Sequence, residues 1–204
     1  KIGFNVRLWY HFSNSILPYH FQKKNYKERA HSKMKMIVDS SIVLIKKIIE
    51  GSNTKVVLVS MYEPDKMTWE DDMPFLLQIK NGFIDNNRVE IMEEPMNLRA
   101  FYTRISQLNL MIGMRLHATL LALRSGVPSI NINYTLKGRD IFNDMGLGDY
   151  VIELEQFIKD PLTVSGRIDD ALYNKELKQS IDLFVKRASE SNLSALKSIF
   201  EIKE

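Results

Sequence analysis

The 204-residue chain contains no cysteine. Disulfide bonds and thiolate metal sites are therefore excluded, and a reducing compartment is mildly favoured, so we expect a cytoplasmic protein. No apolar run reaches the roughly 18 to 20 residues that a membrane span needs, and no signal peptide precedes the first strand pattern. A position at the inner face of the membrane, without a spanning helix, is also compatible with these absences.

An excess of charge is missing too. The formal net charge is +3, which is too small to indicate nucleic-acid binding and suits a site for a small anion. There is no Gly-x-Gly-x-x-Gly or Walker loop. His11, His20 and His31 lack a metal-like spacing with acidic residues. We therefore expect no metal and no bound cofactor.

What is present is an alternation of apolar strand patterns and amphipathic helix patterns. We expect strands at 1–9, 55–61, 88–93, 110–113 and 128–134, and helices at 29–51, 71–83, 97–109 and 118–126. This order predicts an α/β fold, a doubly wound, Rossmann-like parallel sheet. From about residue 154 onward we expect a helical tail. Residues 10–26 form a long connection rich in aromatic residues, and loops of that length are often functional.

The fourth strand ends in polar residues. In an open α/β sheet, ligands bind at the carboxyl ends of the strands. Gly113 allows a tight turn there, and the helix that follows offers free N–H groups to an anion. Arg115 adds a planar fork for carboxylate or phosphate, and His117 can exchange a proton near neutral pH. The alternative is a hydrogen-bonded core histidine and a surface arginine.

Cations follow other strands as well. Arg7 lies late in the first strand, on the same side as Asn5, and it either pairs with a glutamate or faces the ligand crevice. Tyr134 and Lys137 follow the fifth strand, where the alternative is a solvated loop. If the sheet forms as expected, Arg7, Arg115 and Lys137 converge at one edge.

Acidic residues 70–72 could imitate a metal-binding motif. We expect them to begin a helix instead, since acids at a helix N-terminus interact favourably with its dipole.

The segment from Leu108 to Leu154 resembles the C-terminal signature of polysaccharide pyruvyl transferases. In that family a strand is followed by Gly-Met-Arg-Leu-His, an apolar helix, a Val-Pro step, a strand, a tyrosine and a lysine. The matching residues here are Gly113, Met114, Arg115, Leu116, His117, Val127, Pro128, Tyr134 and Lys137.

The resemblance implies the C-terminal half of a GT-B-like enzyme, with phosphoenolpyruvate as donor and a sugar or lipid-linked saccharide as acceptor. Residues 1–204 would be one donor-binding domain. The chain starts at Lys1 without a methionine, so we expect that an N-terminal domain is missing and that this fragment alone is inactive. His117 would be catalytic. Phosphoenolpyruvate would be bound by Arg115, Arg7, Gly113, Leu116, Lys137 and Tyr134.

Two alternatives stay open. The same helix start could hold the diphosphate of a nucleotide sugar in a glycosyltransferase or an epimerase. The domain could also bind a glycan or a partner protein without catalysis.

Overall fold

A computed structural model describes residues 1–9, 16–17, 21–50, 52–61, 71–92 and 97–199, with side chains described as far as residue 191. Its centre is a six-stranded parallel sheet with the strand order β3-β2-β1-β4-β5-β6, the order of a Rossmann fold. The strands are β1 Ile2–Asn5, β2 Val56–Leu58, β3 Val89–Ile91, β4 Leu110–Gly113, β5 Ser129–Asn133 and β6 Val151–Glu153. The predicted α/β fold class is confirmed.

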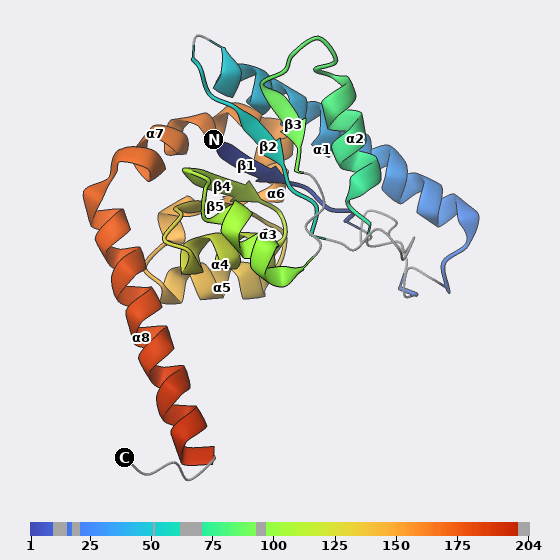
Figure 1. The fold of residues 1–204 in the computed structure, drawn as a ribbon. Coiled ribbons are helices and arrows are strands. Elements are labelled where there is room, and N and C mark those ends of the chain that lie inside the picture. Colours follow the sequence, from blue (N-terminus) through green and yellow to red (C-terminus); the bar gives the residue numbers. More distant parts are fainter. Residues whose placement is uncertain (10–15, 18–20, 51, 62–70, 93–96, 200–204) are drawn as a thin grey trace.

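Helices connect the strands and follow them (Figure 1). The α-helices are α1 Lys24–Ile49, α2 Met73–Asn81, α3 Leu98–Ile105, α4 Leu116–Arg124, α5 Leu136–Asp144, α6 Leu154–Lys159, α7 Ser165–Tyr173 and α8 Lys175–Ile199. Two short 3₁₀ helices, η3 Gly148–Tyr150 and η4 Pro161–Thr163, complete the described elements.

Two apolar clusters lie on the two faces of the sheet. On one face, Met111 and Val57 pack with Phe101 and Ile105 of α3 and with Ala118 of α4. On the other face, a larger cluster joins β1 to α1, α2, α6 and α7. Every residue of β1, β2, β4 and β5 is buried, as expected for a parallel sheet covered on both sides. β2 and β4 contain only apolar residues and glycine, whereas β5 alternates isoleucine with buried serine and asparagine.

Two elements were not predicted. No helix was expected after the fifth strand, where a solvated loop was the alternative for Tyr134 and Lys137, but α5 begins at Leu136, where the Thr135 side chain accepts a hydrogen bond from the Gly138 N–H. Strand β6 is a sixth strand that was not expected either. Only two residues of α5 are buried and β6 has three residues, so neither gives a strong periodic signal.

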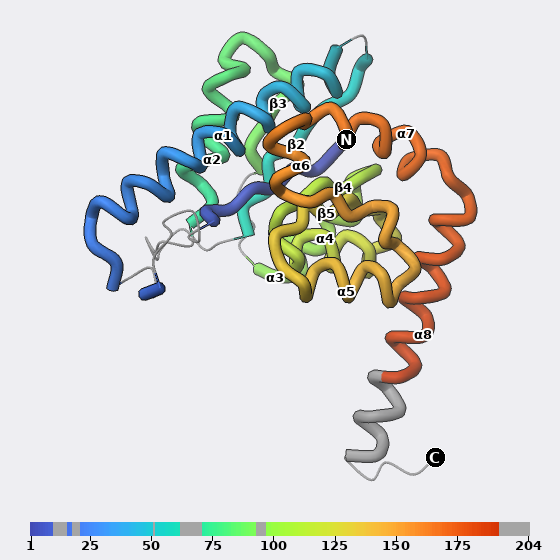
Figure 2. Tube along the Cα trace, turned by 180° about the vertical axis from the view of Figure 1, so that it is seen from behind, coloured from blue at the N-terminus to red at the C-terminus, as the bar shows by residue number. Residues whose placement is uncertain are grey.

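The predicted helical tail after β6 is present, and its last part is divided at Asn174 into α7 and α8. The first turns of α8 place Leu177 and Ile181 in the larger core cluster. Beyond them α8 runs away from the sheet (Figures 1 and 2), and Leu183 and Phe184 are exposed.

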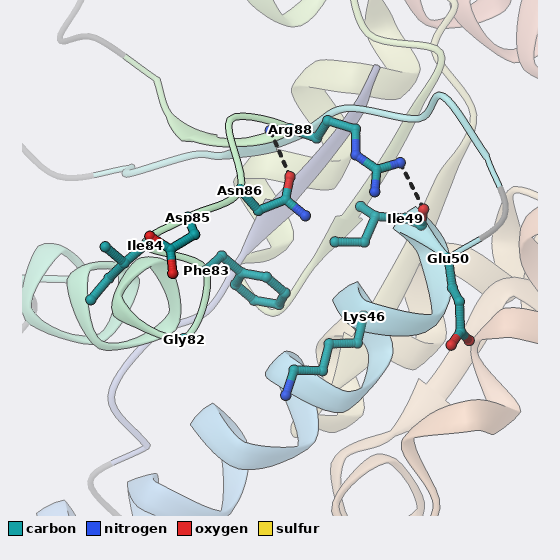
Figure 3. A pocket seen from close by; sticks show the side chains of 9 residues that line it. All are labelled: Lys46, Ile49, Glu50, Gly82, Phe83, Ile84, Asp85, Asn86 and Arg88. Atoms are coloured by element: carbon teal, nitrogen blue, oxygen red, sulfur yellow. Dashed lines mark hydrogen bonds between the residues drawn. The ribbon is translucent and has the colours of Figure 1, made fainter.

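Helix α1 ends beside β3. The guanidinium of Arg88 donates to the carbonyl of Ile49 at 2.8 Å, an acceptor that the helix end leaves open, and to the carbonyl of Ser52, which follows the helix. This side of the sheet holds a cavity of about 510 Å³, lined by the ends of α1 and α2 and by Arg88 (Figure 3). Because Arg88 precedes β3, the cavity lies at the amino ends of the strands. Its place in the fold therefore separates it from the predicted ligand edge.

Candidate functional site

The carboxyl ends of β1, β4 and β5 form a row of polar and small residues on one face of the sheet. Asn5 pairs with Gly113, and Gly113 pairs with Asn131. Both asparagines are buried, and the Asn131 side chain donates to the Gly113 carbonyl at 3.2 Å. A Cβ at Gly113 would lie 3.3 Å from Thr119 Cγ2. The absence of a side chain there lets α4 start close against the sheet.

Arg115 is the residue that turns the chain from β4 into α4. It has extended backbone angles (φ −79°, ψ 116°), and its N–H donates to Asn5 Oδ1 at 3.0 Å. Its side chain forms a two-pronged ion pair with Asp72, with Nε 2.7 Å from Oδ2 and Nη2 2.8 Å from Oδ1. The alternative reading of Arg115 as an ordinary surface helix residue is therefore wrong.

Asp72 pairs with Arg115 at this site, although the sequence indicated only that it begins a helix. The prediction that residues 70–72 begin a helix is confirmed in part, since α2 starts at Met73 and Asp71 Oδ1 accepts the Met73 N–H at 2.8 Å; Glu70 lies outside the described residues. The Asp72 carboxylate makes no capping hydrogen bond. It is fully buried and faces Arg115. Burial raises the pKa of Asp72, and the bond to the Arg115 guanidinium acts in the opposite direction.

His117 is the second residue of α4, and it is exposed. The alternative of a core histidine is therefore wrong. At this helix start, the Arg115 N–H is bonded to Asn5 and the Ala118 N–H to the Arg115 carbonyl at 3.0 Å. Among the described residues, none accepts a hydrogen bond from the backbone N–H of Leu116 or His117. Two open donors beside an exposed imidazole are suited to an anion that also exchanges a proton.

Arg7 and Tyr134, predicted at separate strand ends, contact each other. Arg7 Nη1 donates to the Tyr134 hydroxyl at 3.0 Å, and the guanidinium carbon lies 5.7 Å from the centre of the Tyr134 ring. The Trp9 ring also packs against Tyr134, with the two ring centres 4.2 Å apart. The contacts give Arg7 a fixed place beyond the end of β1.

Lys137 is exposed on the first turn of α5, just beyond the end of β5. Its side chain makes no hydrogen bond or ion pair with any described residue. The structure thus joins Arg7 to Tyr134 and Arg115 to Asn5, while Lys137 contacts neither group. Asn5 had shown a signal in the sequence, a polar residue in an apolar strand on the side of Arg7.

No group of three or more histidine, aspartate or glutamate side chains in the described ranges could hold a metal ion. Within the same part of the chain, no helix is both long enough and apolar enough to cross a membrane. His11, His20 and the other residues of 10–15 and 18–20, which belong to the 10–26 connection, lie outside the described residues.

Fold and site together define a class: a Rossmann-like parallel sheet whose carboxyl edge carries an open helix start, arginines and an exposed histidine. The model of the polysaccharide pyruvyl transferase family matches residues 8–135. The chain therefore belongs to the polysaccharide pyruvyl transferase family, a family of transferases. This match confirms the resemblance seen in the Gly-Met-Arg-Leu-His segment.

Among solved structures, the chain is similar to a putative UDP-N-acetylglucosamine 2-epimerase from Listeria monocytogenes, with 20% identity and a TM-score of 0.48. The similarity covers 82% of this chain and 42% of that one. The chain thus spans less than half the length of that protein. No curated protein matches the chain.

Proposed function

We propose that the protein containing this chain transfers pyruvate from phosphoenolpyruvate to two hydroxyl groups of a sugar, forming a ketal during polysaccharide synthesis. The observation that carries the proposal is the start of α4, where the open N–H groups of Leu116 and His117 lie beside the exposed His117 side chain. Phosphoenolpyruvate bears a carboxylate and a phosphate on one carbon atom. These two groups need an anion site, and ketal formation also needs a proton donor beside it for the methylene carbon.

The anionic donor would be held by backbone and side-chain groups together. The helix start supplies two N–H donors and the positive end of a dipole. Arg7 adds a guanidinium fixed by Tyr134. Arg115 adds a second guanidinium at this edge, whose plane is fixed by two hydrogen bonds to Asp72. Lys137 is a further cation of the same edge.

His117 would act as the general acid and then as a base. Protonation of the methylene carbon makes the central carbon electrophilic. One sugar hydroxyl adds there, the bond from carbon to the phosphate oxygen breaks, and the second hydroxyl closes the ketal. Of the two hydroxyl protons, one balances the proton now in the methyl group and the other leaves with inorganic phosphate. No step calls for oxidation or for a bound cofactor.

The test is the variant His117→Ala in the full-length protein. We expect turnover to fall by about 10²- to 10⁴-fold, the usual contribution of a general acid–base group. Ketal formation is followed by phosphate release and mass spectrometry of the saccharide. His31→Ala is the matched control, because His31 lies on α1 with its ring 5.8 Å from that of Phe75. Near-normal turnover of His117→Ala would contradict the catalytic role.

A second candidate function rests on the same helix start. In a glycosyltransferase or an epimerase, the open N–H groups of α4 would hold the diphosphate of a nucleotide sugar, and the strand order is one that often binds nucleotides. The family assignment favours pyruvyl transfer over this candidate. A location at the inner face of the membrane and a lipid-linked acceptor stay predictions.

A further inference from the structure

The Asp72 carboxylate lies where three separate segments meet. It accepts the two bonds from the Arg115 side chain, one from the Asn5 side chain at 3.3 Å and one from the Met61 N–H at 3.4 Å. These donors belong to the start of α4, the end of β1 and the segment after β2. Asp72 is fully buried, and the Arg115 side chain is 13% exposed.

Stability alone gives a weak reason for such a pair. Removing two charges from water costs several kcal/mol per ion in proteins, which the mutual attraction offsets only in good geometry, and apolar pairs of similar volume are often at least as stable. The pair instead fixes the orientation of the Arg115 guanidinium. Two parallel N–H···O bonds fix the plane of a guanidinium, which one bond would leave free to rotate.

The same network fixes the backbone of the helix start. The Asn5 side chain donates to Asp72 and to the Val59 carbonyl at 2.8 Å, and its Oδ1 accepts the Arg115 N–H. Arg115 is thus held by its side chain and by its backbone, through partners that contact each other. The two open N–H groups come directly after it in the sequence.

We propose that Asp72 is a positioning residue of the donor site, which acts without touching the substrate by fixing Arg115 and, through it, the anion-binding start of α4. This inference rests on the proposed function. It predicts that the orientation of Arg115, more than the charge of Asp72, is what the reaction needs.

The experiment is a double-mutant cycle in the full-length protein. Asp72→Asn keeps the size of the side chain and removes its charge. We expect kcat/KM for phosphoenolpyruvate to fall by about 10- to 100-fold, the range for a misplaced active-site group. Arg115→Lys keeps a cation but loses the fork. In that background, the Asp72→Asn change should leave kcat/KM for phosphoenolpyruvate almost unchanged. If Asp72 instead served stability alone, its factor would be equal in both backgrounds, and the inference would fail.

The experiment includes a matched control variant and a check that each variant folds. Asp71→Asn makes the same chemical change at the neighbouring carboxylate, which bonds the Met73 N–H and should leave kcat/KM unchanged. Circular dichroism and thermal unfolding check the fold of each variant. If Asp72→Asn does not fold, Arg115→Lys alone decides, since near-normal kcat/KM would show that the fixed fork is dispensable. A wild-type protein that neither binds nor turns over phosphoenolpyruvate would refute the proposed function instead.

Discussion

At the scale of single residues, the two arginines of the carboxyl edge have different partners. Arg115 faces a buried carboxylate, whereas Arg7 lies against the ring and hydroxyl of Tyr134. Two parallel hydrogen bonds to Asp72 fix the plane of the Arg115 guanidinium, whereas a hydrogen bond joins Arg7 Nη1 to the Tyr134 hydroxyl. We therefore expect Arg115 to contribute mainly to the geometry of the helix start.

Tyr150 gives a prediction on pH. Its hydroxyl donates to the Asp170 carboxylate, and burial, followed by Asp170, raises the pKa of Tyr150 to about 12 from an ordinary value of 10.0. Because the pKa of Tyr150 is higher in the folded than in the unfolded protein, protonated Tyr150 stabilises the fold. This contribution is complete below pH 10 and is lost as the pH rises through 12. Thermal unfolding between pH 8 and 12, compared with Tyr150→Phe, measures this loss.

The comparison with the phenylalanine variant removes the effects of other groups that titrate in this range. Wild type should be the more stable protein at pH 8, and its advantage in unfolding temperature should shrink above about pH 10. A difference that stays constant across the range would show that the pKa of Tyr150 is not raised by folding.

The sequence predicted part of the candidate site. The positions of Gly113, Arg115 and His117 follow from a strand that ends before an apolar helix, so these residues could be placed from chain order alone. Asp72 could not be paired with Arg115, because the two are 43 positions apart and the approach depends on how α2 packs beside the sheet. Asp72 also lies next to a helix start, where the favourable interaction of acids with the helix dipole already explained the acidic residues.

At the scale of elements, two glycines in helices make a matched pair. A Cβ at Gly138, on the first turn of α5, would collide with Asn133 Oδ1, whereas a Cβ at the exposed Gly166 of α7 meets no atom within 4 Å. Gly138→Ala should therefore lower the free energy of unfolding by about 1–3 kcal/mol through overpacking. Gly166→Ala should raise it by up to about 1 kcal/mol through helix propensity. Chemical denaturation of both variants tests the difference in sign.

Gly138 also shows why α5 could not be predicted from the sequence pattern. Gly138 weakens the helix pattern of α5, yet it is required because the Asn133 side chain, which donates to Glu153 at 3.2 Å, occupies the space beside it. The tertiary contact with Asn133 therefore explains a glycine at position 138, although glycine is unfavourable in a helix. If Gly138→Ala proved as stable as wild type, the packing at the end of β5 would be wrong as described.

At the scale of the whole molecule, the order of strands and helices could be read from the sequence as far as residue 133. β2 and β4 carry apolar runs, and α1 shows a clear apolar stripe that includes Met34, Val38 and Ile45. The strand order required the structure, although a doubly wound sheet was expected from the alternation. The exposed course of α8 could not be predicted, because its amphipathic pattern does not say which surface it meets.

The central claim is that the carboxyl edge of this sheet binds phosphoenolpyruvate as a donor. Calorimetric titration of the full-length protein with phosphoenolpyruvate, and separately with UDP-N-acetylglucosamine, tests it most directly. We predict saturable binding of phosphoenolpyruvate that Arg7→Ala weakens at least tenfold, and no competition by the nucleotide sugar. Binding of the nucleotide sugar in the absence of any affinity for phosphoenolpyruvate would contradict the account.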